Sequence, residues 1–378
     1  TLPRRRLLVL AGSALAAPAF VRHARAADVP RFALGIASGQ PQPGGVVLWT
    51  RLTGEALPER AEVQWEVAED EAFTRIAARG TAGAERAWAH SVHAEVAGLA
   101  PGRWYHYRFT ALGQRSPAGR TRTAPAPDAA APLRAVLASC QRWDHGHWAA
   151  WRDAAERAPD LVLFVGDYIY EYGSPAGVLR RHADTPTRGL VRTLDDYRAR
   201  YAQYKSDPAL QAAHAAAPWL LVWDDHEVEN DYAGDASPSG LDTAAFLRRR
   251  AAAYQAWFEH LPVSPAMAPN GPAMRIHDRY RWGRLAELWT LDGRQYRSVH
   301  ACGDKGAAGG RSISTDCAEL ADPARTVFGA AQERWLAEGL AQSTRAWKLL
   351  AQGSQVSPAG VAVPGLARRC HRSRALRR

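Results

Sequence analysis

Two different hydrophobic patterns predict an α/β protein, built of an N-terminal immunoglobulin-like β-sandwich followed by a layered α/β domain. Between residues 32 and 123, apolar and polar residues alternate in short segments, whereas continuous apolar segments separated by helical stretches follow residue 133. Alternation with a period of two is typical of strands with one buried face, and uniformly apolar strands belong to sheets that are covered on both faces. A Pro- and Ala-rich stretch separates the two patterns.

The clearest alternating segments lie at residues 45–52, 62–67 and 104–109, with Pro- and Gly-containing turns between them. Short strands spaced by such turns are typical of antiparallel sandwiches. We therefore predict a sandwich over residues 28–123 and a linker over residues 124–132. The Trp and Tyr residues of the sandwich are better explained as parts of its core than as a surface on which ligands stack.

Three continuous apolar segments, at residues 133–139, 161–165 and 219–223, predict parallel strands of an α/β domain over residues 133–356. The apolar periodicity predicts helices between and after them. Helices are expected at residues 148–158, 193–215, 242–260 and 330–342, and further strands at 281–291 and 346–351.

Polar side chains that can bind metals follow each of the three apolar strands. Cys140 follows the first, Asp167 and Tyr170 follow the second, and Asp225 and His226 follow the third. Since the carboxyl ends of parallel strands meet at one edge of a sheet, these side chains are expected to converge. A Gly-Asp pair after one strand and an Asp-His pair after the next resemble the pattern of metal-binding motifs in calcineurin-like binuclear metallophosphoesterases.

Five ordered segments make the resemblance more specific. They are Phe-Ala-Leu-Gly-Ile-Ala-Ser-Gly-Gln-Pro (32–41), Ala-Ser-Cys-Gln (138–141), Gly-Asp-Tyr-Ile-Tyr-Glu (166–171), Trp-Asp-Asp-His-Glu (223–227) and Leu-Asp-Gly-Arg-Gln-Tyr-Arg-Ser (291–298). In this order they resemble the PhoD-like alkaline phosphatase family, whose members hydrolyse phosphate monoesters and diesters. The resemblance implies that the second domain has the metallophosphoesterase fold.

The resemblance also implies roles for individual residues. Cys140, Asp167 and Tyr170 match ligands of a ferric ion (Fe3+), and a high-charge cation explains a thiolate and a phenolate as neighbours. Asp167 would bridge to the second metal, a calcium ion (Ca2+). Asp225 would be a further metal ligand, in the place of the asparagine of related phosphoesterases, and His226 would face the phosphate of a small-molecule ester.

Several of these residues have simpler explanations. Cys140 could be a small buried residue, and Tyr170 could pack within its loop. Arg294 could bind phosphate through two hydrogen bonds or could form a structural ion pair. Cys302 and Cys317 flank a Gly-rich segment and are expected to pair as a structural disulfide in an oxidising compartment.

The N-terminal residues 1–27 have the features of an export signal. Arg4, Arg5 and Arg6 precede a modest apolar stretch, and an Ala-Arg-Ala sequence at 24–26 provides a cleavage site. We predict recognition by the twin-arginine translocase, a periplasmic or secreted bacterial protein, and no stable membrane anchor, because the apolar stretch is too short to span a bilayer. The alternative is a disordered basic N-terminus.

The net charge of +10 comes from the ends of the chain. Residues 1–27 contain five arginines and residues 365–378 contain six, and neither segment contains an acidic residue. Without those eleven arginines, the chain has 37 basic and 38 acidic residues. The body is thus nearly neutral, and no specific nucleic-acid binding is expected.

The arginine-rich segment over residues 357–378 departs from the PhoD-like pattern, in which a further Gly-Asp-x-His strand end is expected. Either the catalytic domain is truncated at its C-terminus, as by a frameshift, or the segment is a genuine basic tail. Without further ligands we expect weak activity or none. The alternative function is that of a non-catalytic exported binding protein or a degenerate pseudoenzyme.

Overall fold

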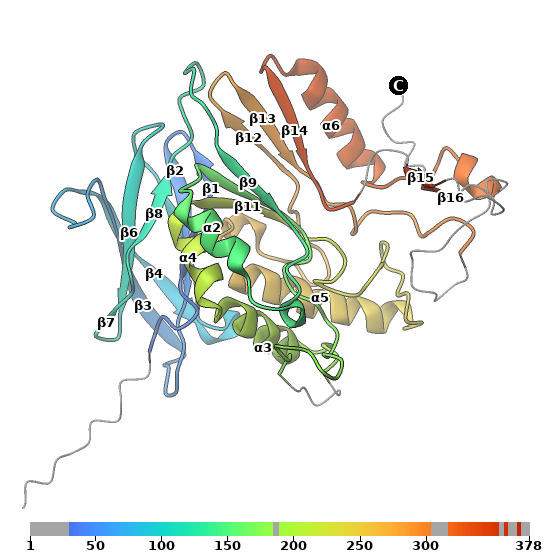
Figure 1. The fold of residues 1–378 in the computed structure, drawn as a ribbon, viewed down its shortest axis with the longest axis horizontal. Helices are drawn as coiled ribbons and strands as arrows, with labels where there is room; N and C mark the ends of the chain where they lie inside the picture. Colours follow the sequence, from blue (N-terminus) through green and yellow to red (C-terminus); the bar gives the residue numbers. More distant parts are fainter. Residues whose placement is uncertain (1–29, 184–188, 304–316, 355–358, 362–368, 372–378) are drawn as a thin grey trace, which may run out of the picture.

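The computed structural model describes residues 30–183, 189–303, 317–354, 359–361 and 369–371. The segment 1–27 that we interpret as an export signal, and most of the 357–378 tail, lie outside these residues. Within the described part of the chain, no helix is both long and apolar enough to cross a membrane. The strands form one sandwich and a second pair of packed sheets beside it (Figure 1).

The N-terminal region is an antiparallel sandwich, as the alternating pattern predicts. One sheet contains β3 (Arg60–Ala68), β4 (Ile76–Glu85), β6 (Trp104–Ala111), β7 (Gln114–Arg115) and β8 (Gly119–Arg122). The facing strands are β1 (Ile36–Gln42), β2 (Gly45–Arg51) and β5 (Ser91–Val96). Alternate residues of both sheets, among them Val63, Tyr107 and Phe109, form a common apolar core. The sandwich therefore has its own interior.

One sheet of the sandwich continues into the α/β domain. The strand order is β5-β2-β1-β11-β10-β9, in which β11 is Pro218–Val222, β10 is Leu161–Val165 and β9 is Ala135–Ala138. Strand β1 pairs in parallel with β11 through Ser38 and Pro218. Gly39 allows this approach, because a Cβ there would lie 2.9 Å from the carbonyl oxygen of Trp219 in β11. Pairing across about 180 residues leaves no trace in local periodicity, so sequence reasoning treated the two regions as separate sheets. The linker boundary itself stays a prediction.

The three continuous apolar segments form the parallel strands β9 (Ala135–Ala138), β10 (Leu161–Val165) and β11 (Pro218–Val222). Four helices cover one face of them: α2 (Ala149–Glu156), α3 (Leu194–Lys205), α4 (Pro208–Ala216) and α5 (Thr243–His260). Thr193 closes a capping box at the start of α3, and Asp207 and Asp242 cap α4 and α5. These side chains fix where the helices begin.

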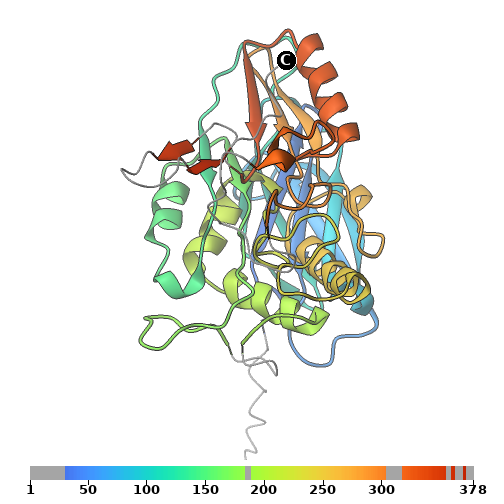
Figure 2. The same ribbon diagram turned by 90° about the vertical axis from the view of Figure 1, so that its right-hand side faces the viewer.

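A second sheet covers the other face of β10 and β11. It contains β12 (Asp278–Trp282), β13 (Ala286–Thr290) and β14 (Trp347–Ala351), and α6 (Ala330–Gln342) packs on its outer side (Figure 2). The prediction of a single strand over residues 281–291 is wrong, because the chain reverses at residues 283–285 and forms an antiparallel pair. The resulting layers are helices, sheet, sheet and helix.

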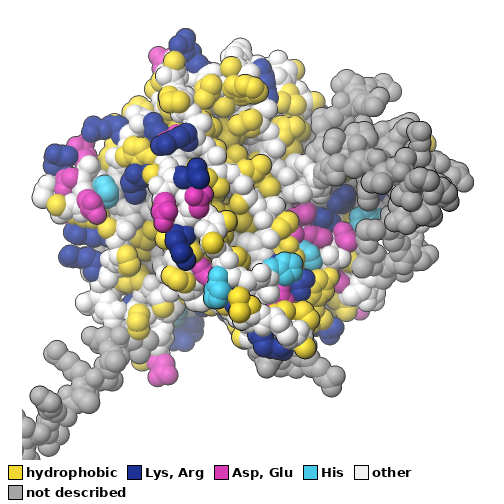
Figure 3. Space-filling model, in the orientation of Figure 1, with side chains coloured by type: hydrophobic (Ala, Val, Ile, Leu, Met, Phe, Trp, Pro, Cys, Tyr) yellow, Lys and Arg dark blue, Asp and Glu magenta, His cyan; other side chains and the backbone are white. Residues whose placement is uncertain are grey.

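Short elements complete the described chain. The 3-10 helices are η1 (Arg86–Trp88), η2 (Trp143–His145), η3 (Pro265–Met267) and η4 (Ala318–Ala321), and β15 (Ala359–Val361) pairs with β16 (Arg369–His371). A disulfide joins Cys302 to Cys317, with their Cα atoms 6.2 Å apart. On the face shown in Figure 3, basic side chains are interspersed with acidic ones.

Candidate metal centre

The loops after β9 and β10 run side by side at one edge of the sheet. The amide of Cys140 donates to the carbonyl of Gly166 at 3.1 Å, and that of Gln141 donates to the carbonyl of Asp167 at 3.2 Å. Both Cys140 (φ 59°) and Asp167 (φ 61°) adopt left-handed backbone conformations. Such a conformation is unfavourable for cysteine, although aspartate tolerates it, and strained residues concentrate at functional sites.

Gly166 is required by its surroundings. Its φ of 103° is one that other residues rarely adopt, and a Cβ there would lie 2.5 Å from the Cβ of Asp224. The loop after β10 thus lies directly against the loop after β11. Glu227 ties these two loops together, since its carboxylate accepts from the amides of Tyr168 at 2.5 Å and Asp224 at 2.9 Å.

Cys140 and Tyr170 both approach the same oxygen of Asp167. The Cys140 Sγ lies 3.4 Å from Asp167 Oδ2, and the Tyr170 hydroxyl donates to that oxygen at 3.1 Å. Three side chains expected to bind the ferric ion are therefore gathered at one point. Partial loss of solvent raises the pKa of the Cys140 thiol, although the residue is exposed, and burial raises that of the Tyr170 hydroxyl. Both groups therefore favour their protonated forms unless a cation binds.

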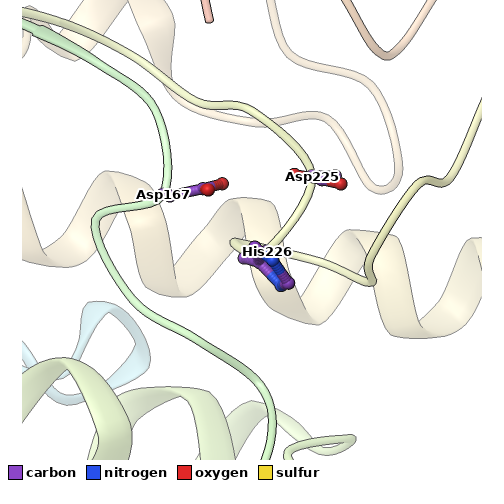
Figure 4. A group of neighbouring side chains, drawn as sticks. All are labelled: Asp167, Asp225 and His226. Atoms are coloured by element: carbon purple, nitrogen blue, oxygen red, sulfur yellow. The ribbon is translucent and has the colours of Figure 1, made fainter. Parts of the chain in front are cut away.

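The loop after β11 adds Asp225 and His226 to this group. One ligand atom each from Asp167, Asp225 and His226 lies within 4.8 Å of the other two. In Figure 4 the carboxylate of Asp167 points toward Asp225 across the space between the two loops. The structure thus brings together Cys140 and the four other residues that the sequence placed at this strand edge.

The charges at this edge are suited to a cation. Burial and then the nearby charge of Asp225 raise the pKa of Asp167 to about 7. The other oxygen of Asp167, Oδ1, is buried and has no hydrogen-bond partner. A buried carboxylate oxygen without a donor is unfavourable, whereas a metal ion would satisfy it. The residues present therefore fit a metal site.

Arg294 lies beside these carboxylates with 5% of its surface exposed. Its Nε is 2.6 Å from Asp224, and its terminal nitrogens are 3.4 Å from Asp225 and 3.8 Å from Asp231. Arg294 therefore makes ion pairs of the kind that the sequence left open, and its binding of phosphate stays a prediction. Although burial opposes it, Arg294 holds the pKa of Asp225 below its usual range.

Glu171 and Arg200 support the site and were not recognised as supporting residues in the sequence. Glu171 Oε2 lies 2.7 Å from His226 Nδ1. Burial alone would lower the pKa of His226, but Glu171 outweighs it and the pKa rises to about 9. Arg200, 2% exposed, donates to the carbonyls of Tyr170 and Tyr172. Residues so far apart along the chain give no local sequence signal.

Comparison with known proteins decides the family. The sequence profile "PhoD-like phosphatase" matches residues 135–366, and "PhoD-like phosphatase, N-terminal domain" matches residues 15–125. The chain belongs to the PhoD-like phosphatase family. As a PhoD-like chain, it is 46% identical over 333 residues to alkaline phosphatase D of Bacillus subtilis (strain 168), a match that covers 85% of this chain.

A solved structure supports the same conclusion. The chain described as "Structure of PhoD" matches 89% of this PhoD-like chain with a TM-score of 0.80 and 44% sequence identity. The match covers 63% of that solved chain, and the match to the Bacillus subtilis protein covers 55% of its length. The present chain therefore spans less than two thirds of each relative.

Proposed function

We propose that this chain hydrolyses phosphate monoesters or diesters at a binuclear metal site formed by the loops after β9, β10 and β11. The observation that carries the proposal is the meeting of Cys140 and Tyr170 on one oxygen of Asp167, whose other oxygen is buried without a donor. A thiol, a phenol and a carboxylate in contact form a donor set suited to a high-charge cation.

In this proposal, Cys140, Asp167 and Tyr170 would hold Fe3+, and Asp167 and Asp225 would hold Ca2+. When bound, the two ions draw charge from the phosphoryl oxygens and activate water. His226 lies beside both carboxylates and, held by Glu171, is placed to donate a proton to a phosphoryl or leaving-group oxygen. Arg294 keeps Asp225 charged and oriented.

The direct test is a metal titration of the purified chain with a chromogenic phosphate monoester and the corresponding diester. We expect at most weak turnover with Fe3+ and Ca2+ together, and a visible charge-transfer band from the thiolate and phenolate. Cys140→Ser and Tyr170→Phe should each shift that band and weaken iron binding. Iron binding with an unchanged band in both variants would contradict the ligand assignment.

The same assay separates the alternatives. A chain that binds neither metal and turns over neither ester fits the non-catalytic binding protein or degenerate pseudoenzyme. Weak turnover with bound metals fits the expected impairment, which stays a prediction. Which of the two ester classes is preferred follows from the ratio of kcat/KM values.

We also propose export through the twin-arginine translocase to the periplasm or the medium. Support comes from the arginines and the Ala-Arg-Ala sequence of residues 1–27 alone. Replacing Arg5 and Arg6 together by lysine should retain the protein in the cytoplasm of a bacterial host, as measured by cell fractionation. Unchanged export of this variant would exclude the pathway.

A further inference from the structure

The imidazole of His226 is held on three sides by three consecutive residues. Its ring centroid lies 4.1 Å from that of Tyr170, with the planes tilted by 34°, and 5.5 Å from that of Tyr172 in an edge-on contact. Glu171, between the two tyrosines, contacts Nδ1 at 2.7 Å. The ring therefore has little freedom to turn over.

This three-residue segment is itself fixed in place. Arg200 donates to the carbonyl of Tyr170 and, at 2.8 Å, to that of Tyr172, and it also reaches the carbonyl of Gly189 at 2.9 Å. A guanidinium whose donors are shared among three carbonyls holds a loop more rigidly than any single hydrogen bond does. The segment is thus preorganised before any substrate arrives.

We propose that Glu171 is the positioning residue of His226, which keeps a hydrogen on Nδ1 and leaves Nε2 to face the phosphate ester. An ionised carboxylate can only accept, so Nδ1 must carry the hydrogen between them. Glu171 has 1% of its surface exposed, and its other oxygen accepts from the amide of Asn230 at 2.7 Å. Both oxygens are therefore occupied and the carboxylate cannot rotate freely. The role in the reaction rests on the proposed function; the role in setting the ring nitrogens does not.

For the substitution Glu171→Gln, the contact with Asn230 allows the tautomer of His226 to be predicted. A backbone N–H can only donate, so the new amide oxygen must remain on Asn230 and the new NH2 group must face Nδ1. Nδ1 then has to accept, and the hydrogen of neutral His226 moves to Nε2. One isosteric change thus inverts the tautomer.

The measurement is a one-bond and long-range 1H–15N correlation of the thirteen histidines, with His226 identified from the spectrum of His226→Gln. At a pH above the range in which the 15N shifts of His226 titrate, so that the imidazole is neutral, the hydrogen should lie on Nδ1 in wild type and on Nε2 in Glu171→Gln. Glu171→Asp, which keeps the acceptor on a shorter side chain, should retain the wild-type tautomer at least in part. Glu287→Gln, a buried glutamate of β13, is the matched control and should leave His226 unchanged.

Wild-type His226 with its hydrogen on Nε2 would overturn the proposal without need of any variant. So would an unchanged tautomer in Glu171→Gln. In an active protein with equal metal content, Glu171→Gln should lower kcat by about 10- to 100-fold and leave KM nearly unchanged, and an unchanged kcat would refute the positioning role. If wild type turns over no ester but the tautomer inverts, only the proposed function fails.

Discussion

The interior of the sandwich and the edge of the α/β sheet are both buried, but opposite kinds of side chain fill them. Between the sandwich sheets, residues such as Val63, Tyr107 and Phe109 are completely buried among apolar neighbours. At the edge after β10 and β11, the carboxylates of Asp167 and Asp225 lie close together, and the pKa of Asp167 is raised while that of Asp225 is lowered. Burial of apolar side chains stabilises the sandwich, whereas burial of like charges at the sheet edge lowers stability and is typical of a functional site.

The largest expected effect is at the edge. Asp167→Asn should lower ester hydrolysis by more than about 100-fold, because the carboxylate shared by both metals is lost. The metal-free chain should nevertheless be as stable as wild type or more so at pH 8, because the buried charge repelled by Asp225 is removed. Activity assays and urea unfolding in a chelator measure both quantities.

The exposed Asp153 of α2, whose side chain is 61% accessible, gives the matched control, and Asp153→Asn should change neither quantity. A marked loss of stability in metal-free Asp167→Asn would show that the edge is not strained by its charge, and the contrast between the two regions would disappear.

The next effect is in the sandwich. Phe109→Ala should lower the free energy of unfolding by about 3–5 kcal/mol, because a completely buried aromatic ring is replaced by a cavity. Its neighbour Thr110 is only half-buried, so Thr110→Ala should cost less than about 1 kcal/mol. Chemical denaturation measures both. Equal effects at the two positions would mean that this core contributes little.

Glu287 is a buried carboxylate outside the metal centre. It tests whether a buried charge that is paired with arginines stabilises the fold, in contrast to the crowded carboxylates of the metal centre. Burial would raise the pKa of Glu287, but Arg279 at 2.5 Å and Arg281 at 2.8 Å lower it to about 2. Because the folded pKa lies below the unfolded value, the stabilisation is complete above pH 4.5 and is lost as the pH falls toward 2.

Glu287→Gln should therefore lower the free energy of unfolding by about 2 kcal/mol at pH 7, after allowance for the solvent around the arginines. The difference from wild type should shrink as the pH is lowered from 4.5. Urea unfolding at a series of pH values measures it, and a difference that is constant down to pH 3 would contradict the assignment.

The smallest expected effect is at the junction of the two regions. Lys205 is 1% exposed, its Nζ has no hydrogen-bond partner, and it lies 4.0 Å from the centroid of the Trp49 ring. Burial lowers its pKa well below 10.5. Because the folded pKa lies below the unfolded value, the unfolded chain binds more protons than the folded chain between the two pKa values, so wild-type stability rises as the pH approaches 10.5.

Lys205→Met should raise the free energy of unfolding by about 1 kcal/mol at pH 7, and the gain should narrow toward pH 10.5. Lys348→Met, at an exposed position of β14, should be nearly neutral at every pH. Thermal unfolding at several pH values compares the two. A destabilised Lys205→Met would mean that the ammonium gains more from Trp49 than it loses by burial.

By itself, the sequence determined the two fold patterns, the helices and most strands, because periodicity is a local property of the chain. It also placed Cys140, Asp167 and Asp225 at one edge, because residues that follow parallel strands share that edge. Only the tertiary structure decided that β1 joins β11, that Glu171 contacts His226, and that Arg294 is enclosed by carboxylates. Those contacts join residues separated by many positions, and their partners are selected by burial and packing in three dimensions, on which local sequence carries no information.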